Sequence, residues 1–234
     1  GVGIIIITGI SIPILGNYTL SVTGIIFSLI TMIIILKISQ KLDKYLSNNT
    51  IILMGMVISL FLNSLLTTFS ALYSKKIEAI SRWQMGSFSL KGWSYLKMGL
   101  PFMIIAIIWL MFYLREMDIM TFGEEDAKAL GVETEKTKYR LFIIVSILTG
   151  TAVSMSGIIG FIDLIAPHVA RKLFGARHKF VIPVSFIFGG VMMVITDLVA
   201  RIVIQPAELP VGAVTALIGA PVFAYIYFNK RGKL

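Results

Sequence analysis

Residues 20–36 read LSVTGIIFSLITMIIIL, an apolar run without a charged side chain. Comparable apolar runs, broken by short polar stretches, occupy residues 1–15, 50–73, 98–115, 140–156, 160–174, 181–203 and 211–228. A hydrocarbon core about 30 Å thick needs roughly 20 mostly apolar residues for each crossing helix. The runs therefore predict an all-α polytopic membrane protein, with about eight transmembrane helices in one domain over residues 1–234.

The composition supports this class. Hydrophobic residues make up 57% of the 234 residues and charged residues 14%, whereas a soluble globular domain has roughly 45–50% and about 25%. A water-soluble domain is thereby excluded. The absence of cysteine excludes a disulfide, a thiolate nucleophile and a cysteine metal site. The chain starts at Gly1 and enters an apolar run at once, so we interpret it as N-terminally incomplete.

The net charge of +9 could indicate a nucleic-acid partner, but the basic residues lie in short connections between the apolar runs. We therefore interpret them as basic residues that flank membrane spans. Of the 21 Lys and Arg residues, the predicted outer side keeps only Lys75, Lys76, Arg82, Lys91, Lys97 and Arg201. The others gather on the side of the C-terminus. The positive-inside rule therefore predicts a cytoplasmic C-terminus.

Two connecting segments are long enough to hold structure of their own. The outer segment, residues 74–97, has tryptophans that favour anchoring at the membrane interface over ligand contact. The inner segment, residues 117–138, predicts a short helix with Thr121 as N-cap, acidic residues in its first turn and Gly131 as terminator. Such a helix is too small for a core of its own. From composition alone it docks equally well on its own membrane domain or on a soluble partner.

Three motifs then point to a family. They are GEEDAKALGV at residues 123–132, SGIIGFIDLIAPHVARKLFGARHKFVIP at 156–183, and DLVARIVIQPAELPVGAVTALIGAPVFAYI at 197–226, with a looser match through GSFS at 86–89. In this order and spacing the chain resembles the permeases of ABC importers for iron-siderophore, haem and cobalamin, the FecCD or vitamin-B12-type family. The resemblance implies a ten-helix bundle, of which this chain corresponds to the last eight helices.

The resemblance also implies roles for individual residues. The cytoplasmic segment 117–138 corresponds to the region that couples to the ATPase, through Gly123, Glu124, Glu125, Ala127, Leu130, Gly131 and Val132. Arg201 corresponds to an arginine that receives a glutamate of the substrate-binding protein. The spans 50–73 and 211–228 correspond to helices that line the translocation path, with Asn63, Thr67, Thr215 and Gly219 as candidate lining residues.

Five further residues are assigned structural roles: Pro167, His168, Asp197, Glu208 and Pro210. Pro167 is expected to kink or break its helix, with His168 at the helix end. No second ligand stands three or four residues from His168, so we expect no metal site. Asp197 stands four residues before Arg201, the spacing of an ion pair. The role of Asp163, an acid inside an apolar run, stays open.

The implied function is a permease subunit in the cytoplasmic (inner) membrane of a prokaryote, importing an iron chelate (siderophore or haem) or cobalamin. The sequence contains no phosphate-binding loop, so ATP and Mg²⁺ are expected on a partner ATPase and no cofactor on this chain. Expected partners are two ABC ATPase subunits, an extracytoplasmic binding protein, membrane lipid and a second permease subunit, identical or related. The alternative is an ion-gradient-driven secondary transporter with ion sites at Asp163 and Asp197. Paired acids, a histidine cluster or cysteine would indicate an intramembrane enzyme, and the chain has none.

Overall fold

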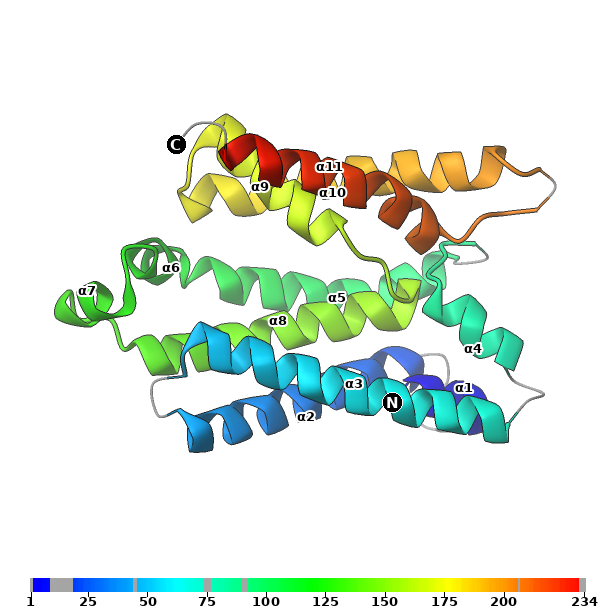
Figure 1. The fold of residues 1–234 in the computed structure, drawn as a ribbon, viewed down its shortest axis with the longest axis horizontal. Helices are drawn as coiled ribbons and strands as arrows, with labels where there is room; N and C mark the ends of the chain where they lie inside the picture. The colour runs from blue at the N-terminus through cyan, green and yellow to red at the C-terminus, as the bar shows by residue number, and fades with distance from the viewer. Residues whose placement is uncertain are drawn as a thin grey trace. The chain divides into compact units, whose positions relative to one another are not determined.

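The computed structural model describes residues 2–8, 19–43, 46–73, 77–89, 92–205 and 207–231, and every regular element in these ranges is a helix. The prediction of an all-helical protein is confirmed for the described residues. The chain forms two compact units, shown in Figure 1. Unit 1 comprises Gly1–Ser81 and Lys91–Met155, and unit 2 comprises Arg82–Leu90 and Ser156–Leu234.

Unit 1 contains the first part of the helical order. Its helices are α1 (Val2–Thr8), α2 (Thr19–Leu42), α3 (Asn48–Leu72), α5 (Trp93–Met111), α6 (Leu114–Met120), α7 (Glu124–Ala129) and α8 (Thr134–Ser156). Helix α4 (Ile77–Gln84) runs across the boundary in sequence. Unit 2 holds α9 (Ile162–Phe174), α10 (His178–Ile202) and α11 (Val211–Arg231).

Small residues bring the backbones of α2 and α8 close together in unit 1. A Cβ added at Gly150 would lie 2.9 Å from the carbonyl oxygen of Gly24, which is closer than real Cβ contacts. Next to it, the Ser28 hydroxyl donates a 2.9 Å hydrogen bond to the carbonyl of Ser146. Without a hydrophobic drive between helices in lipid, such close packing and interhelical hydrogen bonds hold a bundle together. Helices α2 and α8 therefore approach each other closely at these small residues.

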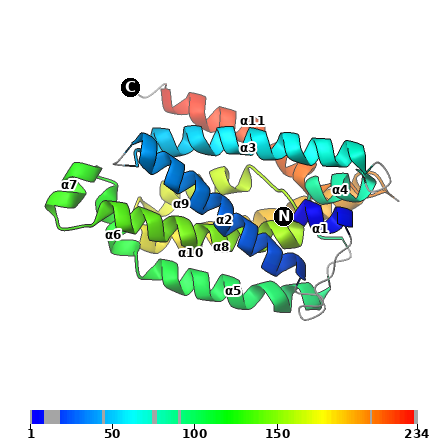
Figure 2. The ribbon, with the colours of Figure 1, turned by 90° about the horizontal axis from the view of Figure 1, so that it is seen from below.

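The short helices α6 and α7 lie at one end of unit 1. Figures 1 and 2 both show them beyond the long helices α5 and α8, at the same end as the turn between α2 and α3. At that end the buried residues Leu36, Leu46 and Ile51 form a hydrophobic cluster, against which Tyr139 and Phe142 of α8 pack. The α2–α3 turn is thus fixed to the start of α8.

Unit 2 is built around α9, which packs mainly against α10, while α11 packs against both. The irregular stretch 157–160 joins α8 to α9 and lies against residues 83–86. Gly157 has φ +79°, and a Cβ there would overlap the carbonyl oxygen of Trp83. The amide of Ser87 also donates a 2.9 Å hydrogen bond to the carbonyl of Ser156. Residues 82–89 are therefore built into unit 2.

Within the described residues, five helices are long and apolar enough to cross a membrane: α2, α3, α5, α8 and α10. Helix α11 has a shorter apolar part, Val211–Tyr225. The span predicted at 160–174 is wrong as a full crossing, because α9 has 13 residues and therefore reaches only about 20 Å. Of the span predicted at 1–15 the structure describes α1, Val2–Thr8, and residues 9–15 lie outside the described residues.

Several helices extend beyond the apolar runs that predicted them. Helix α2 continues to Leu42 and α8 already begins at Thr134, although the runs covered 20–36 and 140–156. Lys, Gln and Glu are good helix formers, so a helix continues where the apolar pattern stops. The apolar run therefore predicted only the central or apolar part of each helix and not its ends.

Candidate functional site

Helix α7 is a short, well-terminated helix at the end of unit 1. Gly123 precedes it as the N-cap with φ +125°, and Gly131 follows with φ +83°. The amide of Val132 donates to the carbonyl of Ala127 at 2.9 Å, and the amide of Gly131 donates to that of Lys128 at 3.0 Å. This pair of bonds is a Schellman cap, which a glycine in the left-handed conformation allows. The predicted helix and its terminator Gly131 are confirmed.

The predicted N-cap of this helix is wrong. Thr121 ends α6 instead, and its hydroxyl donates a 2.6 Å hydrogen bond to the carbonyl of Asp118. Gly123 takes the N-cap position, which glycine tolerates. Three acidic residues follow in the first turn, where negative charge interacts favourably with the helix dipole. Residues 114–129 therefore form two short helices joined by a turn.

The sides of α7 differ in burial. Ala127 is fully buried within unit 1, so it packs against its own chain. Leu130 is 67% exposed and Phe122, at the start of the segment, is 77% exposed. Glu125 is also exposed, whereas Glu124 is half-buried. Of the predicted apolar contacts Ala127, Leu130 and Val132, Leu130 therefore offers the largest surface, and Phe122 adds an apolar side chain that the sequence reasoning missed.

Glu124 is half-buried because it pairs with Lys138 of α8. The Lys138 side chain is 8% exposed, and its amine also donates a 2.9 Å hydrogen bond to the carbonyl of Leu46. Sequence reasoning missed this lysine, because nothing in the pattern distinguishes it from its exposed neighbour Lys136. Helix α7 is thus tied to its own membrane domain on one side and exposed on the other. Docking of the exposed side on a soluble partner stays a prediction.

In unit 2, the predicted pair of Asp197 and Arg201 is confirmed: Nε of Arg201 lies 2.9 Å from Oδ2 of Asp197. Glu208 accepts a hydrogen bond from the Ser89 hydroxyl. Pro210 directly precedes α11, and its carbonyl accepts from the amide of Ala213 at 3.0 Å. The acid and the proline thus stand at the start of α11, as predicted.

The candidate lining residues fall into two groups. Asn63 and Thr67 lie exposed on α3, where the Thr67 hydroxyl donates to the carbonyl of Asn63 at 3.0 Å. Thr215 is buried, with its hydroxyl bonded to the carbonyl of Gly212 at 3.0 Å. Gly219 is buried too, since a Cβ there would overlap the side chain of Phe161. In this structure these two residues of α11 pack within unit 2, and their role in lining the path stays a prediction.

Asp163 is the second residue of α9, not an acid in mid-span. Its exposed carboxylate stands by the positive end of the helix dipole. Pro167 lies inside α9 without breaking it, and His168 lies in the middle of the helix, not at the predicted end. Within the described residues no three or more His, Cys, Asp and Glu side chains gather where a metal ion could be held.

These elements define a polytopic integral membrane protein with an exposed, capped helix at the end of its first unit. Comparison with known proteins identifies the family. A model of the FecCD transport family matches residues 1–229, and the chain belongs to that family.

Relatives and a solved structure agree with this assignment. The uncharacterized ABC transporter permease protein YvrB of Bacillus subtilis is 39% identical over 99% of this chain and 65% of its own length. The hemin transport system permease protein HmuU of Yersinia pestis is 32% identical, covering 98% of this chain and 69% of its own. The cobalamin import system permease protein BtuC of Halobacterium salinarum is 36% identical, over 78% and 49% respectively.

A solved structure described as an inward-facing conformation of a metal-chelate type ABC transporter matches with a TM-score of 0.85 and 31% identity. The match covers 98% of this chain and 71% of that one. The chain thus spans about half to two thirds of the length of the first curated relatives that it matches.

Proposed function

We propose that the chain is part of the permease subunit of an ATP-driven importer in the cytoplasmic membrane of a prokaryote. Its cargo class is a metal chelate, haem or cobalamin. Membership of the FecCD transport family supports this proposal, as do relatives whose names specify cobalamin, Fe(3+) dicitrate and hemin transport.

The observation that carries the proposal is the exposed side of α7. The helix is capped at both ends by glycines, held to unit 1 through Glu124, and presents Leu130 and Phe122 outward. Together with membership of a transport family, these two exposed apolar side chains outside the long apolar helices support a protein contact at α7. The sequence contains no phosphate-binding loop, so the partner that hydrolyses ATP with Mg²⁺ is a separate ATPase, and we propose that it docks on α7.

If the chain is a permease, one of its helices lines the path of the cargo, and α3 is the candidate. Helix α3 is long enough to cross the membrane and exposes Asn63 and Thr67. The hydroxyl of Thr67 is satisfied within its own helix, so this surface is polar without carrying a charge. We infer that it lines the path beside a second permease subunit and lets a bulky chelate pass without tight binding.

Arg201 of unit 2 is the candidate contact for the protein that delivers the cargo. Arg201 is 44% exposed and held by Asp197, and we infer that it receives a carboxylate of an extracytoplasmic binding protein. The C-terminus, at the other end of α11, is then cytoplasmic.

The test is uptake into proteoliposomes that contain the full-length permease, its ATPase and its binding protein. Radiolabelled ferric siderophore, haem and cobalamin are offered in separate assays. We expect uptake of one of them that requires ATP and persists with an uncoupler, while an ATPase variant unable to hydrolyse ATP gives none. An ion-gradient-driven transporter would instead lose uptake with the uncoupler, and that result would replace the proposal.

A further inference from the structure

The side chain of Lys138 is buried and charged at the α7 end of unit 1. It is 8% exposed, and a buried ammonium is costly unless it is paired and hydrogen-bonded. Both conditions are met, because its amine contacts the carboxylate of Glu124 on α7 and donates to the carbonyl of Leu46 at 2.9 Å. One side chain therefore joins three segments: α7, the α2–α3 turn and α8.

Within the α2–α3 turn, Asp43, Leu46 and Ser47 are held by specific contacts. Leu46 is fully buried and has φ +50°, a left-handed conformation that a leucine keeps only where its surroundings enforce it. Asp43 stabilises the turn, since its carbonyl accepts from the amide of Leu46 at 3.1 Å and its carboxylate from the amide of Ser47 at 2.9 Å. A displacement of Leu46 is therefore passed through these hydrogen bonds to Asp43, directly after α2, and along the chain to Ser47, directly before α3.

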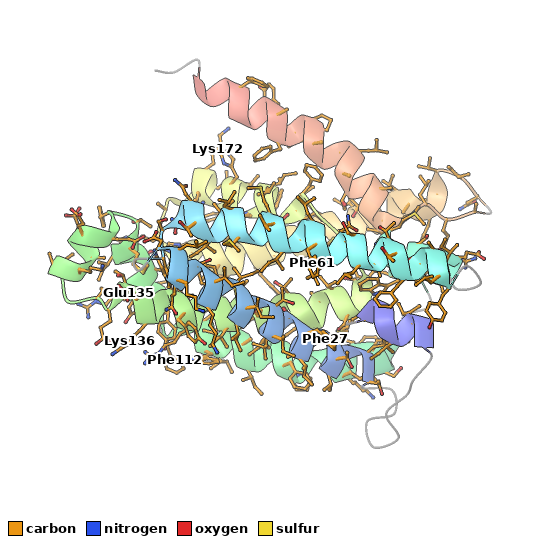
Figure 3. The ribbon with its side chains drawn as sticks, turned by 60° about the horizontal axis from the view of Figure 1, so that its bottom comes forward. Phe27, Phe61, Phe112, Glu135, Lys136 and Lys172 are labelled. Atoms are coloured by element: carbon orange, nitrogen blue, oxygen red, sulfur yellow. The ribbon has the colours of Figure 1, made fainter. Side chains whose placement is uncertain are left out.

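Helix α3 starts two residues after Leu46, and its buried residue lies close to that start. Ile51 is the buried residue of α3, in the cluster with Leu36 and Leu46. Beyond it the helix is largely exposed, as Phe61 illustrates in Figure 3. A displacement of the turn therefore acts first on the start of α3.

From these contacts we propose that Lys138 is a positioning residue that latches α7 to the α2–α3 turn, so that a displacement of α7 by the ATPase is passed to α3. This inference rests on the proposed function for its driving force, but the latch itself is a property of the permease alone. We call the contacts of Lys138 with Glu124 and Leu46 the latch.

Two neighbouring ion pairs are exposed and, unlike that of Lys138, do not hold a buried charge. Lys136 and Glu133 lie 2.9 Å apart with side chains 66% and 65% exposed, and Lys128 and Glu135 are 3.9 Å apart. Exposed pairs of this kind contribute little to stability. Lys136 lies on the same helix two residues before Lys138 and is labelled in Figure 3, so it is the matched control.

The first experiment measures the latch in the permease without ATPase. The chain has no cysteine, so spin labels can be attached to cysteines introduced at the exposed residues Leu130 and Asn49. We expect a narrow distance distribution in the parent and in Lys138→Arg and Lys136→Met. In Lys138→Met the separated population should rise by about tenfold, because a hydrogen-bonded charge pair is lost. Glu124→Gln, which keeps the shape of the side chain, tests the same pair if Lys138→Met fails to fold.

The second experiment measures transmission in the full-length complex with ATPase. Labels at the exposed residues Leu72 of α3 and Lys97 of α5 report the far end of unit 1. ADP with vanadate should shift their distance in the parent, Lys138→Arg and Lys136→Met. The shift should be lost in Lys138→Met although the ATPase still copurifies.

The outcomes separate the two proposals. An unchanged distribution and an unchanged shift in Lys138→Met would overturn the latch while leaving the proposed function intact. Failure of the ATPase to bind the parent permease would instead contradict the proposed function, and the first experiment would still decide whether Lys138 holds α7.

Discussion

Nε of Arg201 lies 2.9 Å from Oδ2 of Asp197, one turn earlier on α10. The contact holds the guanidinium at the end of the helix while 44% of the side chain stays exposed. An exposed i,i+4 pair contributes only about 0.3–0.5 kcal/mol to stability. Its main consequence is therefore orientation, and the pair presents a positive group at the surface.

Replacing Arg201 with glutamate should weaken docking of the binding protein. The change puts a negative charge where we propose that a carboxylate docks, so attraction becomes repulsion. We expect an affinity at least about tenfold lower in a binding assay at low salt. Asp197→Asn, which keeps the arginine, should lower affinity much less. Unchanged affinity of the Arg201→Glu variant would remove the docking assignment.

Lysine substitutions at the adjacent residues Glu124 and Glu125 should affect stability differently. Glu125 is exposed, so Glu125→Lys should change the free energy of unfolding by less than about 0.5 kcal/mol. Glu124→Lys places two ammonium groups together at a buried site and should cost about 3 kcal/mol or more. Thermal unfolding in detergent measures this difference.

Transport assays complete that comparison. We expect both variants to insert into the membrane and both to lose ATP-driven uptake, Glu125→Lys through the contact with the ATPase and Glu124→Lys through the latch. Normal uptake by the double variant would contradict the assignment of α7 as the coupling helix.

The sequence predicted those features whose causes are local. The α7 helix followed from acidic residues before Ala127 and a glycine at 131, and the structure shows that cap bond by bond. The pair of Asp197 and Arg201 followed from the spacing of a helical turn. In each case the residues that determine the feature lie within a few positions of each other.

Features that depend on distant residues were not predictable. The stretch GIIGF at 157–161 is as apolar as a helix, and the chain leaves helical geometry there because Gly157 packs against the Trp83 carbonyl. The burial of Thr215 and Lys138 likewise arises from packing of segments far apart in the sequence. Hydropathy reports which residues avoid water and does not distinguish lipid from a neighbouring helix.

The break before α9 gives a third prediction. Gly157→Ala should destabilise the protein by about 1–3 kcal/mol or more, because φ of +79° and the overlap with Trp83 both oppose a Cβ. Gly160→Ala is the matched control, since nothing lies within 4 Å of its added Cβ. We expect a clear drop in the midpoint of thermal unfolding for the first variant and almost none for the second. Equal midpoints would mean that this close approach does not exist.

The exposed apolar residue of α7 gives the last prediction. Leu130→Ser should weaken binding of the ATPase by roughly ten- to a hundredfold, since a buried leucine contributes about 1.5–3 kcal/mol to a contact. Stability should hardly change, because Leu130 is 67% exposed in the chain by itself. Leu72→Ser is the control, as Leu72 is 71% exposed at the far end of α3. If both variants bind the ATPase equally well, α7 is not the docking surface, whereas selective loss in Leu130→Ser places the contact there.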